Sequence, residues 1–213
     1  MSGLSHADKM LRGLNRVKRI GIYAGVFDPV HTGHITTALL AIEEATLDQV
    51  VFLPERRPRH KHGVEHFGHR VAMLQRAVKP HAKLSVLELE DTSFSVNRTL
   101  LRLHKLFPGA ELVFIWGSDK VSKIATWSDA RVLFERTEFV IALRQGVTRT
   151  QIQAIIAQWP WQPRGLYIFD SFAGAISASI VREALRRRHK QPGLLPSVAR
   201  YADQHWLYIS FSA

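Results

Sequence analysis

Residues 20–34 read IGIYAGVFDPVHTGH, and this stretch decides how the first part of the chain folds. Its first five residues form an apolar run typical of a buried strand, and the glycine and proline that follow indicate a tight turn into a helix. His31 and His34 are three positions apart, so they fall on the same side of the first helical turn. Gly33 lies between them and leaves room for another molecule to approach the backbone.

The residue types around this turn suit a phosphate group. The first turn of a helix offers unpaired N–H groups and the positive end of the helix dipole. Imidazoles there can donate hydrogen bonds to phosphate oxygens without a metal ion. The stretch therefore indicates nucleotide binding and transfer at a phosphorus atom. The structural alternative is that the two histidines only cap and pack the helix.

Further apolar runs alternate with segments of helical period. We expect strands at 49–53, 83–87, 111–116, 139–143 and 166–169, helices at 67–78, 96–107, 148–158 and 179–188, and a loop at 189–197. Alternation of this kind predicts an α/β fold, a Rossmann-like doubly wound parallel sheet with helices on both faces. Ligands of such sheets bind at the carboxyl ends of the strands near the switch point, and residues 20–34 lie at such an end.

The composition is that of an ordinary globular protein, with 213 residues of which 46% are hydrophobic and 22% charged. We expect a basic N-terminal extension over residues 1–18 and a single domain over residues 19–213. The chain has no cysteine, which excludes disulfides and thiolate metal sites and permits the cytoplasmic location that we expect. No apolar run approaches the ~20 residues of a membrane span, so we expect no membrane partner.

The net charge of +11 attracts polyanions and also steers small phosphorylated substrates. Basic residues gather at 12–19, 56–62 and 182–190, and two of these clusters adjoin candidate site motifs. This distribution favours small substrates over a specific nucleic-acid partner. The sequence permits a homo-oligomer but does not give the oligomeric state.

Two later segments carry groups that suit a nucleotide. Residues 176–182, ISASIVR, open a basic helix in which Ser177 or Ser179 can cap the first turn and Arg182 offers a planar donor fork to a phosphate. The alternative for this segment is a well-capped helix with no ligand. Asp119 follows a predicted strand and can accept from a ribose hydroxyl or hold a metal-bound water, or it is simply a turn carboxylate.

These segments resemble known signatures. Gly25 to His34 matches the pattern Gly-x-Phe-Asp-Pro-x-His-x-Gly-His of the nucleotidylyltransferases that carry a His-x-Gly-His motif. Residues 176–182 are similar to their second signature, Ile-Ser-Ser-Thr-x-Ile-Arg, with Ala178 in place of the middle serine. Within that group, the chain from Lys18 to Tyr208 resembles the bacterial nicotinate (nicotinamide) mononucleotide adenylyltransferase family.

The resemblance implies a reaction and a set of site residues. The implied reaction transfers the adenylyl group of ATP to nicotinate mononucleotide, releasing pyrophosphate and forming deamido-NAD in NAD biosynthesis. The implied catalytic residues are His31, His34, Lys61 and Arg182. The implied nucleotide-binding residues are Gly25, Val26, Phe27, Gly33, His34, Gly117, Asp119, Ile176, Ser177, Ser179 and Arg182.

The resemblance also supplies an acceptor site. Trp127 would stack on the pyridine ring, Ser95 would contact its carboxylate, and His60 and Arg144 would lie near substrate phosphates. We expect Mg²⁺ as cofactor, bound through the ATP phosphates, and assign no protein metal ligand.

One departure from the family pattern leaves alternatives open. Residues 93–100 read SFSVNRTL where the family has Ser-Tyr-Thr-x-Asp-Thr-Leu, so this chain has an extra residue and the basic Arg98. Together with Ala178, this keeps three alternatives: another acceptor, CTP in place of ATP, or a catalytically weak relative that binds nucleic acid or regulates.

Overall fold

The computed structural model describes residues 17–58, 63–91, 93–171, 176–187, 189 and 193–209. Six strands form one sheet: β1 (Arg19–Gly25), β2 (Gln49–Pro54), β3 (Leu84–Val86), β4 (Glu111–Gly117), β5 (Glu138–Leu143) and β6 (Leu166–Asp170). The helices are α2 (Thr32–Glu44), α3 (Phe67–Val78), α4 (Val96–Leu106), α5 (Val121–Ile124), α6 (Ala130–Arg136), α7 (Arg149–Ile156), α8 (Ala178–Arg186) and α9 (Pro196–Gln204), with a 3₁₀ turn η1 (Ser118–Lys120).

The strand order is β3-β2-β1-β4-β5-β6, and every neighbouring pair is parallel. The chain works outward from β1 to β3 and then returns to the other side of β1 with β4. The carboxyl ends of β1 and β4 therefore flank the switch point at which ligands bind in this topology. The predicted Rossmann-like doubly wound sheet is confirmed.

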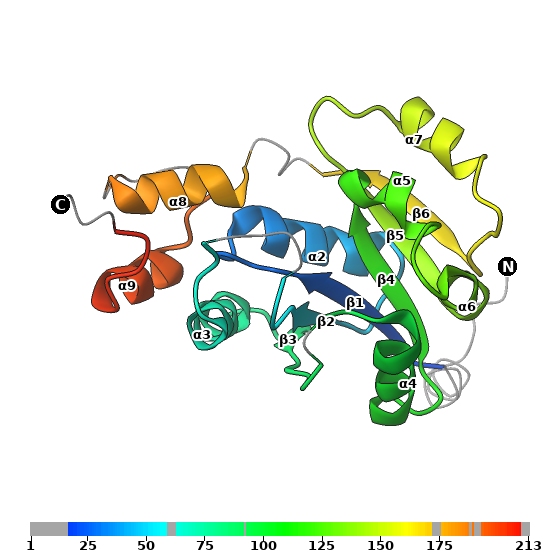
Figure 1. Ribbon diagram of the computed structural model, residues 1–213, viewed down its shortest axis with the longest axis horizontal. Coiled ribbons are helices and arrows are strands. Elements are labelled where there is room, and N and C mark those ends of the chain that lie inside the picture. The colour runs from blue at the N-terminus through cyan, green and yellow to red at the C-terminus, as the bar shows by residue number, and fades with distance from the viewer. Residues whose placement is uncertain are drawn as a thin grey trace, which may run out of the picture.

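Helices cover both faces of the sheet because the central strands are apolar on both sides. On β4, Val113 and Ile115 pack with α2, α3, α8 and α9, whereas Leu112, Phe114 and Trp116 pack with α4, α5, α6 and α7. Figure 1 shows α8 and α9 beyond one end of the sheet, with the beginning of α8 beside the beginning of α2. No helix in the described part of the chain is long and apolar enough to cross a membrane.

The structure differs from the sequence prediction mainly in short helices. The predicted loop at 189–197 is wrong at its end, because α9 begins at Pro196. Proline is well suited to the first helical position, where no intrahelical N–H bond is lost. The helices α5 and α6, of four and seven residues, were not predicted, since so short a segment shows little periodicity.

The end of the sheet opposite the switch point is held by a partly buried ion-pair network. Arg19 donates to Glu111 at 2.8 Å and to Glu138 at 2.7 Å, and so ties the start of β1 to β4 and β5. These carboxylates raise the pKa of Arg19 well above its ordinary value, chiefly through the hydrogen bond to Glu138. Arg19 is thus part of the sheet's internal structure and does not belong to a free basic surface.

Candidate active site

A large cavity of about 1030 Å³ opens at the carboxyl ends of β1 and β4. Such a volume is at the upper end for ligand pockets. All the predicted site residues that the structure describes line it: Gly25, Val26, Phe27, His31, Gly33, His34, Ser95, Gly117, Asp119, Trp127, Arg144, Ile176, Ser177, Ser179 and Arg182. The sheet topology therefore brings segments from both ends of the sequence to one place.

The two histidines of residues 20–34 stack on each other at the start of α2. Their ring centroids are 3.8 Å apart with an interplanar angle of 30°. The backbone N–H of His31 donates to Nδ1 of His34 at 3.3 Å. Because Nδ1 accepts this N–H, the donor nitrogen of the ring is Nε2.

His31 is kept neutral by its surroundings. Its side chain is buried, and burial, aided by the positive charge of Arg144, lowers the pKa of His31 to about 4. Its Nδ1 is buried and has no hydrogen-bond partner among the described residues. An unpaired buried polar atom at the edge of a cavity is costly unless a ligand or water pairs it. At neutral pH the His31 ring is therefore uncharged, and it can act toward phosphate as a hydrogen-bond donor rather than as a cation.

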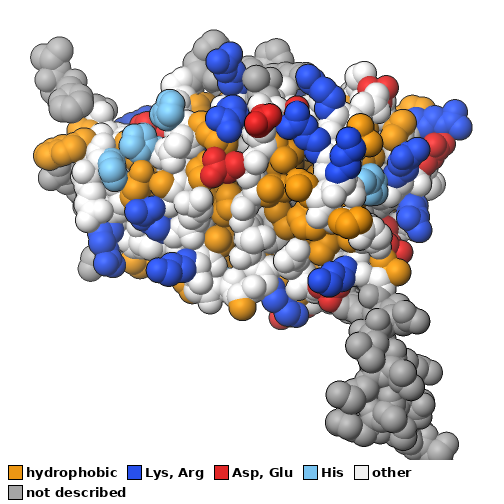
Figure 2. Space-filling model, turned by 90° about the horizontal axis from the view of Figure 1, so that it is seen from below, with side chains coloured by type: hydrophobic (Ala, Val, Ile, Leu, Met, Phe, Trp, Pro, Cys, Tyr) orange, Lys and Arg blue, Asp and Glu red, His pale blue; other side chains and the backbone are white. Residues whose placement is uncertain are grey.

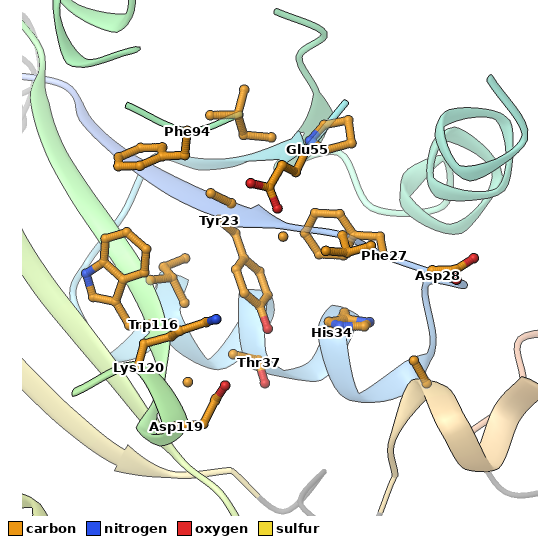
Figure 3. A pocket seen from close by; sticks show the side chains of 18 of the residues that line it. Tyr23, Phe27, Asp28, His34, Thr37, Glu55, Phe94, Trp116, Asp119 and Lys120 are labelled. Carbon is orange, nitrogen blue, oxygen red and sulfur yellow. The ribbon is translucent and has the colours of Figure 1, made fainter. Parts of the chain in front are cut away.

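Aromatic side chains hold His34 in place. Phe27 packs edge-on against the His34 ring at 5.1 Å and also against Phe52 at 5.4 Å. Phe27 has a φ of 50°, a left-handed conformation that is uncommon for a bulky residue and is found where the surrounding structure enforces it. Figure 3 shows Phe27 and His34 side by side on the cavity wall, with Tyr23 of β1 next to them.

The start of α8 forms the wall next to α2. Ser177 caps α8 by accepting the N–H of Ile180 at 3.3 Å. Arg182 donates from Nη1 to the backbone carbonyl of Asp28 at 2.7 Å and from Nη2 to Ser179 at 3.3 Å. Ala178 also lines the cavity, so the family's middle hydroxyl is missing from the wall itself. The two helix N-termini and the guanidinium together make an anion-binding corner.

The end of β4 contributes an ion pair. Asp119 in η1 lies 3.2 Å from Nε of Arg144, which follows β5. A Cβ on Gly117 would come within 2.6 Å of the Asp119 carboxylate, so glycine at this position lets the pair form. The Arg144 backbone N–H also donates to Ser118 at 3.1 Å, which fixes the relation of β4 to β5 at the cavity.

The opposite end of the cavity is aromatic. Trp127 packs against Trp116 at 5.3 Å and Phe94 at 5.8 Å, and all three rings line the cavity. Ser95 precedes α4 without using its hydroxyl to cap the helix, and its own N–H donates to Thr99 at 3.1 Å. A flat wall beside a hydroxyl that does not cap α4 and a helix N-terminus suits a planar ring with an acidic substituent.

Several lining residues were missed by the sequence prediction. Lys120 and Lys123 lie on the cavity wall one helical turn apart, beside Asp119 and Trp127, and add positive charge. The spacing of three between Lys120 and Lys123, directly after Asp119, was the available signal. Figure 3 shows the Lys120 side chain extending between Trp116 and Asp119 toward Tyr23. Burial raises the pKa of Tyr23 to about 12, so its hydroxyl is protonated at neutral pH.

Three residues from the sequence analysis are not among the described residues that line the cavity: the predicted site residues His60 and Lys61, and the basic Arg98 that departs from the family pattern. His60 and Lys61 lie outside the described residues, so the structure does not locate them. Arg98 is exposed on α4 and does not line the cavity, so its charge faces solvent. Within the described ranges, no group of three or more His, Cys, Asp or Glu side chains could hold a metal ion.

Comparison with known proteins decides the family. Residues 22–184 match the cytidylyltransferase-like family. A probable nicotinate-nucleotide adenylyltransferase of Desulfitobacterium hafniense is 35% identical over 199 residues, which cover 90% of this chain and 96% of the relative. The chain belongs to the nicotinate-nucleotide adenylyltransferase family. This confirms the family predicted from the sequence motifs.

Further relatives agree in sequence and in fold. The probable nicotinate-nucleotide adenylyltransferase of Neisseria meningitidis is 30% identical over 90% of this chain and 99% of its own length. Nicotinic acid mononucleotide adenylyltransferase of Plasmodium falciparum, solved in complex with NaAD, superimposes with a TM-score of 0.74 at 22% identity, covering 90% of this chain and 97% of that chain. The structural likeness shows that this member of the family has the same fold.

Proposed function

We propose that this protein transfers the adenylyl group of ATP to nicotinate mononucleotide, forming deamido-NAD and pyrophosphate in NAD biosynthesis. The observation that carries the proposal is the convergence of three features on one cavity. These are the stacked His31 and His34, the α8 corner with Arg182, and the aromatic end around Trp127. The first two suit the phosphates of a triphosphate, and the third suits a pyridine ring.

In the mechanism we propose, a phosphate oxygen of the mononucleotide attacks the α-phosphorus of ATP in line, the bond from that phosphorus to the bridging oxygen breaks, and pyrophosphate leaves. This reaction needs no covalent nucleophile from the protein. It contributes position and stabilisation of developing charge. The neutral imidazoles of His31 and His34 donate to phosphate oxygens, and Arg182, with Lys61, neutralises the leaving pyrophosphate.

The nucleotide and the acceptor take opposite ends of the cavity in this proposal. Residues 25–27, Gly33, Gly117, Asp119, Ile176, Ser177 and Ser179 bind ATP. Trp127 stacks on the acceptor ring, Ser95 donates to its carboxylate, and Arg144 and His60 contact substrate phosphate. Asp119, assigned to ATP, and Arg144, assigned to the substrate phosphate, form an ion pair at 3.2 Å. This pair positions the two binding regions relative to each other.

We propose Mg²⁺ as the cofactor, entering with ATP. The described part of the chain groups no three acidic or imidazole side chains that could hold an ion, which fits a metal carried mainly by phosphate oxygens and water. When bound, Mg²⁺ would neutralise negative charge on the phosphates. The residues that face that charge from the protein are donors: His31, His34 and Arg182.

The basic charge of the chain is proposed to steer substrates. Figure 2 shows Lys and Arg side chains on one face interspersed with acidic, hydrophobic and neutral ones. On α8, Arg186 and Arg187 both pair with Glu183, which reduces the field of that helix. We propose that the protein works in the cytoplasm on small phosphorylated substrates, as one domain spanning residues 19–213. Duplex DNA should bind weakly and dissociate with rising salt.

A pyrophosphate-release assay tests the proposed function. The purified full chain is offered ATP or CTP with nicotinate mononucleotide, nicotinamide mononucleotide or a sugar phosphate. Release only with ATP and a pyridine mononucleotide supports the proposal, and chromatography should then find the dinucleotide. Release with CTP and a different acceptor would contradict it, as would tight sequence-selective DNA binding without transfer.

A further inference from the structure

A buried contact joins the C-terminal part of the described chain to the turn of residues 20–34. Tyr208, which follows α9, donates from its hydroxyl to Oδ1 of Asp28 at 2.7 Å. The two side chains are 8% and 5% exposed. Asp28 lines the cavity, and Tyr208 lies behind its wall. Figure 3 shows the Asp28 carboxylate directed away from His34 and Tyr23.

Asp28 in turn holds Arg182. Its backbone carbonyl accepts from Nη1 of Arg182 at 2.7 Å, while its carboxylate Oδ2 is 3.9 Å from the same nitrogen. The carboxylate is thus near the guanidinium without a close ion pair, although such pairs form readily at shorter distance. A hydrogen bond from another donor would keep the Asp28 carboxylate from moving closer and neutralising the Arg182 cation.

The Tyr208 hydroxyl is suited to do this. Burial and the neighbouring Asp28 raise the pKa of Tyr208 well above its ordinary value, so the hydroxyl stays protonated and donates. The only other hydrogen bond to Oδ1 within the described residues is from the N–H of Glu65, at 3.4 Å. Without the hydroxyl, the buried carboxylate would lack its shortest donor. Among the described residues, the cation within ion-pair distance of this carboxylate is Arg182, at 3.9 Å.

We propose that Tyr208 is a positioning residue for the triphosphate site: by fixing the Asp28 carboxylate, it leaves the charge of Arg182 free for a phosphate. The proposal rests on the proposed function in assigning Arg182 to ATP. It makes the segment after α9 part of the site, although no residue of that segment lines the cavity in the described structure.

The chain offers a matched control. Tyr201 on α9 is 7% exposed, and its hydroxyl lies 3.0 Å from Nδ1 of His69 on α3, away from the cavity. Tyr208→Phe and Tyr201→Phe therefore remove the same atom from equally buried sites. Titration calorimetry with ATP and no acceptor should show the dissociation constant rising about tenfold in Tyr208→Phe, as for one lost charge-assisted bond, and less than about twofold in Tyr201→Phe.

A double-mutant cycle separates positioning from general loosening. If Tyr208 acts through the Asp28 carboxylate, Asp28→Asn removes the charge that would pair with Arg182, so it should weaken ATP binding less than Tyr208→Phe does, and adding Tyr208→Phe to it should cost nothing further. If Tyr208→Phe alone does not fold, the comparison of Asp28→Asn with the double variant still tests the coupling, and a further tenfold loss in the double variant would overturn the proposal. Unchanged ATP binding in Tyr208→Phe, equal losses in the two tyrosine variants, or full additivity would overturn the proposal. Because the readout needs no acceptor, a wild type that binds ATP but adenylylates no pyridine mononucleotide overturns the proposed function alone. A wild type that binds no nucleoside triphosphate overturns both.

Discussion

Nδ1 of His34 accepts the backbone N–H of His31 at 3.3 Å, so an imidazole pairs one of the N–H groups at the start of α2. The other nitrogen of the same ring, Nε2, is the one that can donate. The two interpretations of these histidines, as helix caps or as phosphate ligands, are therefore compatible, since they use different atoms of one ring. They can also be separated by mutation.

Replacing His34 should separate the cap from the catalytic role. In His34→Asn, the side-chain oxygen can still accept the His31 N–H, whereas His34→Ala loses that bond and about 0.5–2 kcal/mol of stability. Both variants lose the Nε2 donor, so both should lower turnover by a factor on the order of 10². Steady-state pyrophosphate release and urea unfolding check the two effects. Near-normal turnover in a folded His34→Asn protein would contradict the role of His34.

The buried neutral His31 should make stability depend on pH. Its pKa is about 4 in the folded protein and 6.5 when unperturbed. The unfolded chain therefore binds a proton more readily between these values, and stability present above pH 6.5 is lost as the pH falls toward 4. The loss is up to about 3 kcal/mol. Urea unfolding near neutral pH and at mildly acidic pH should show a smaller loss for His31→Gln, which cannot titrate. Equal losses would show that His31 is not the group responsible.

The fold could be predicted because its central strands are continuous apolar runs between helical segments. Residues 112–116 are buried on both faces of the sheet. A continuous apolar run of this kind is typical of a parallel sheet that helices cover on both faces. The short β3 at the edge and the helices α5 and α6 gave weaker signals, since few residues repeat in them. α9 carried a start signal in Pro196, which the sequence analysis read as part of a loop.

The site was predictable where one short segment carries it. The His31–His34 pair and residues 176–182 each have a local pattern. The contact between Asp28 and Tyr208 joins residues 180 positions apart, and neither residue carries a local signal for the other. In the sequence, Trp116 likewise looks like part of a buried strand. Its ring lines the cavity because β4 ends there, which the sequence pattern does not show.

A methyl group on Gly117 should damage nucleotide binding with little effect on the fold. In Gly117→Ala the new Cβ would come within 2.6 Å of the Asp119 carboxylate and 3.4 Å of Nε of Arg144, so their ion pair must shift. We expect the KM for ATP to rise about tenfold, the equivalent of one charge-assisted hydrogen bond. Gly146→Ala is the matched control, because Gly146 has a φ of +82° and open space around it. That variant should lose about 1 kcal/mol of stability and keep its KM. The reverse pattern would contradict this account of Gly117.

The last prediction concerns the choice of acceptor. The aromatic end of the cavity offers donors in the uncapped hydroxyl of Ser95 and the N-terminus of α4, and the cations of Lys120 and Lys123 lie on the same wall as Trp127. Donors and positive charge favour a carboxylate over a neutral amide. Loss of one charge-assisted bond costs ~1.5–3 kcal/mol, so nicotinate mononucleotide should be preferred over its amide by roughly ten- to a hundred-fold in kcat/KM.

Ser95→Ala should narrow this preference, because it removes a donor that the carboxylate uses more than the amide does. Ser122→Ala is the control, since Ser122 is exposed on α5 and does not line the cavity. The measurement is kcat/KM for both acceptors at one saturating ATP concentration in the wild type and the two variants. Equal values for the two acceptors in the wild type would mean that the altered 93–99 segment has changed the pocket. An unchanged ratio in Ser95→Ala would mean that the α4 backbone or the two lysines recognise the carboxylate. Lys123→Gln would then distinguish these two possibilities. Only the loss of a cation should make the preference for the acid less sensitive to salt.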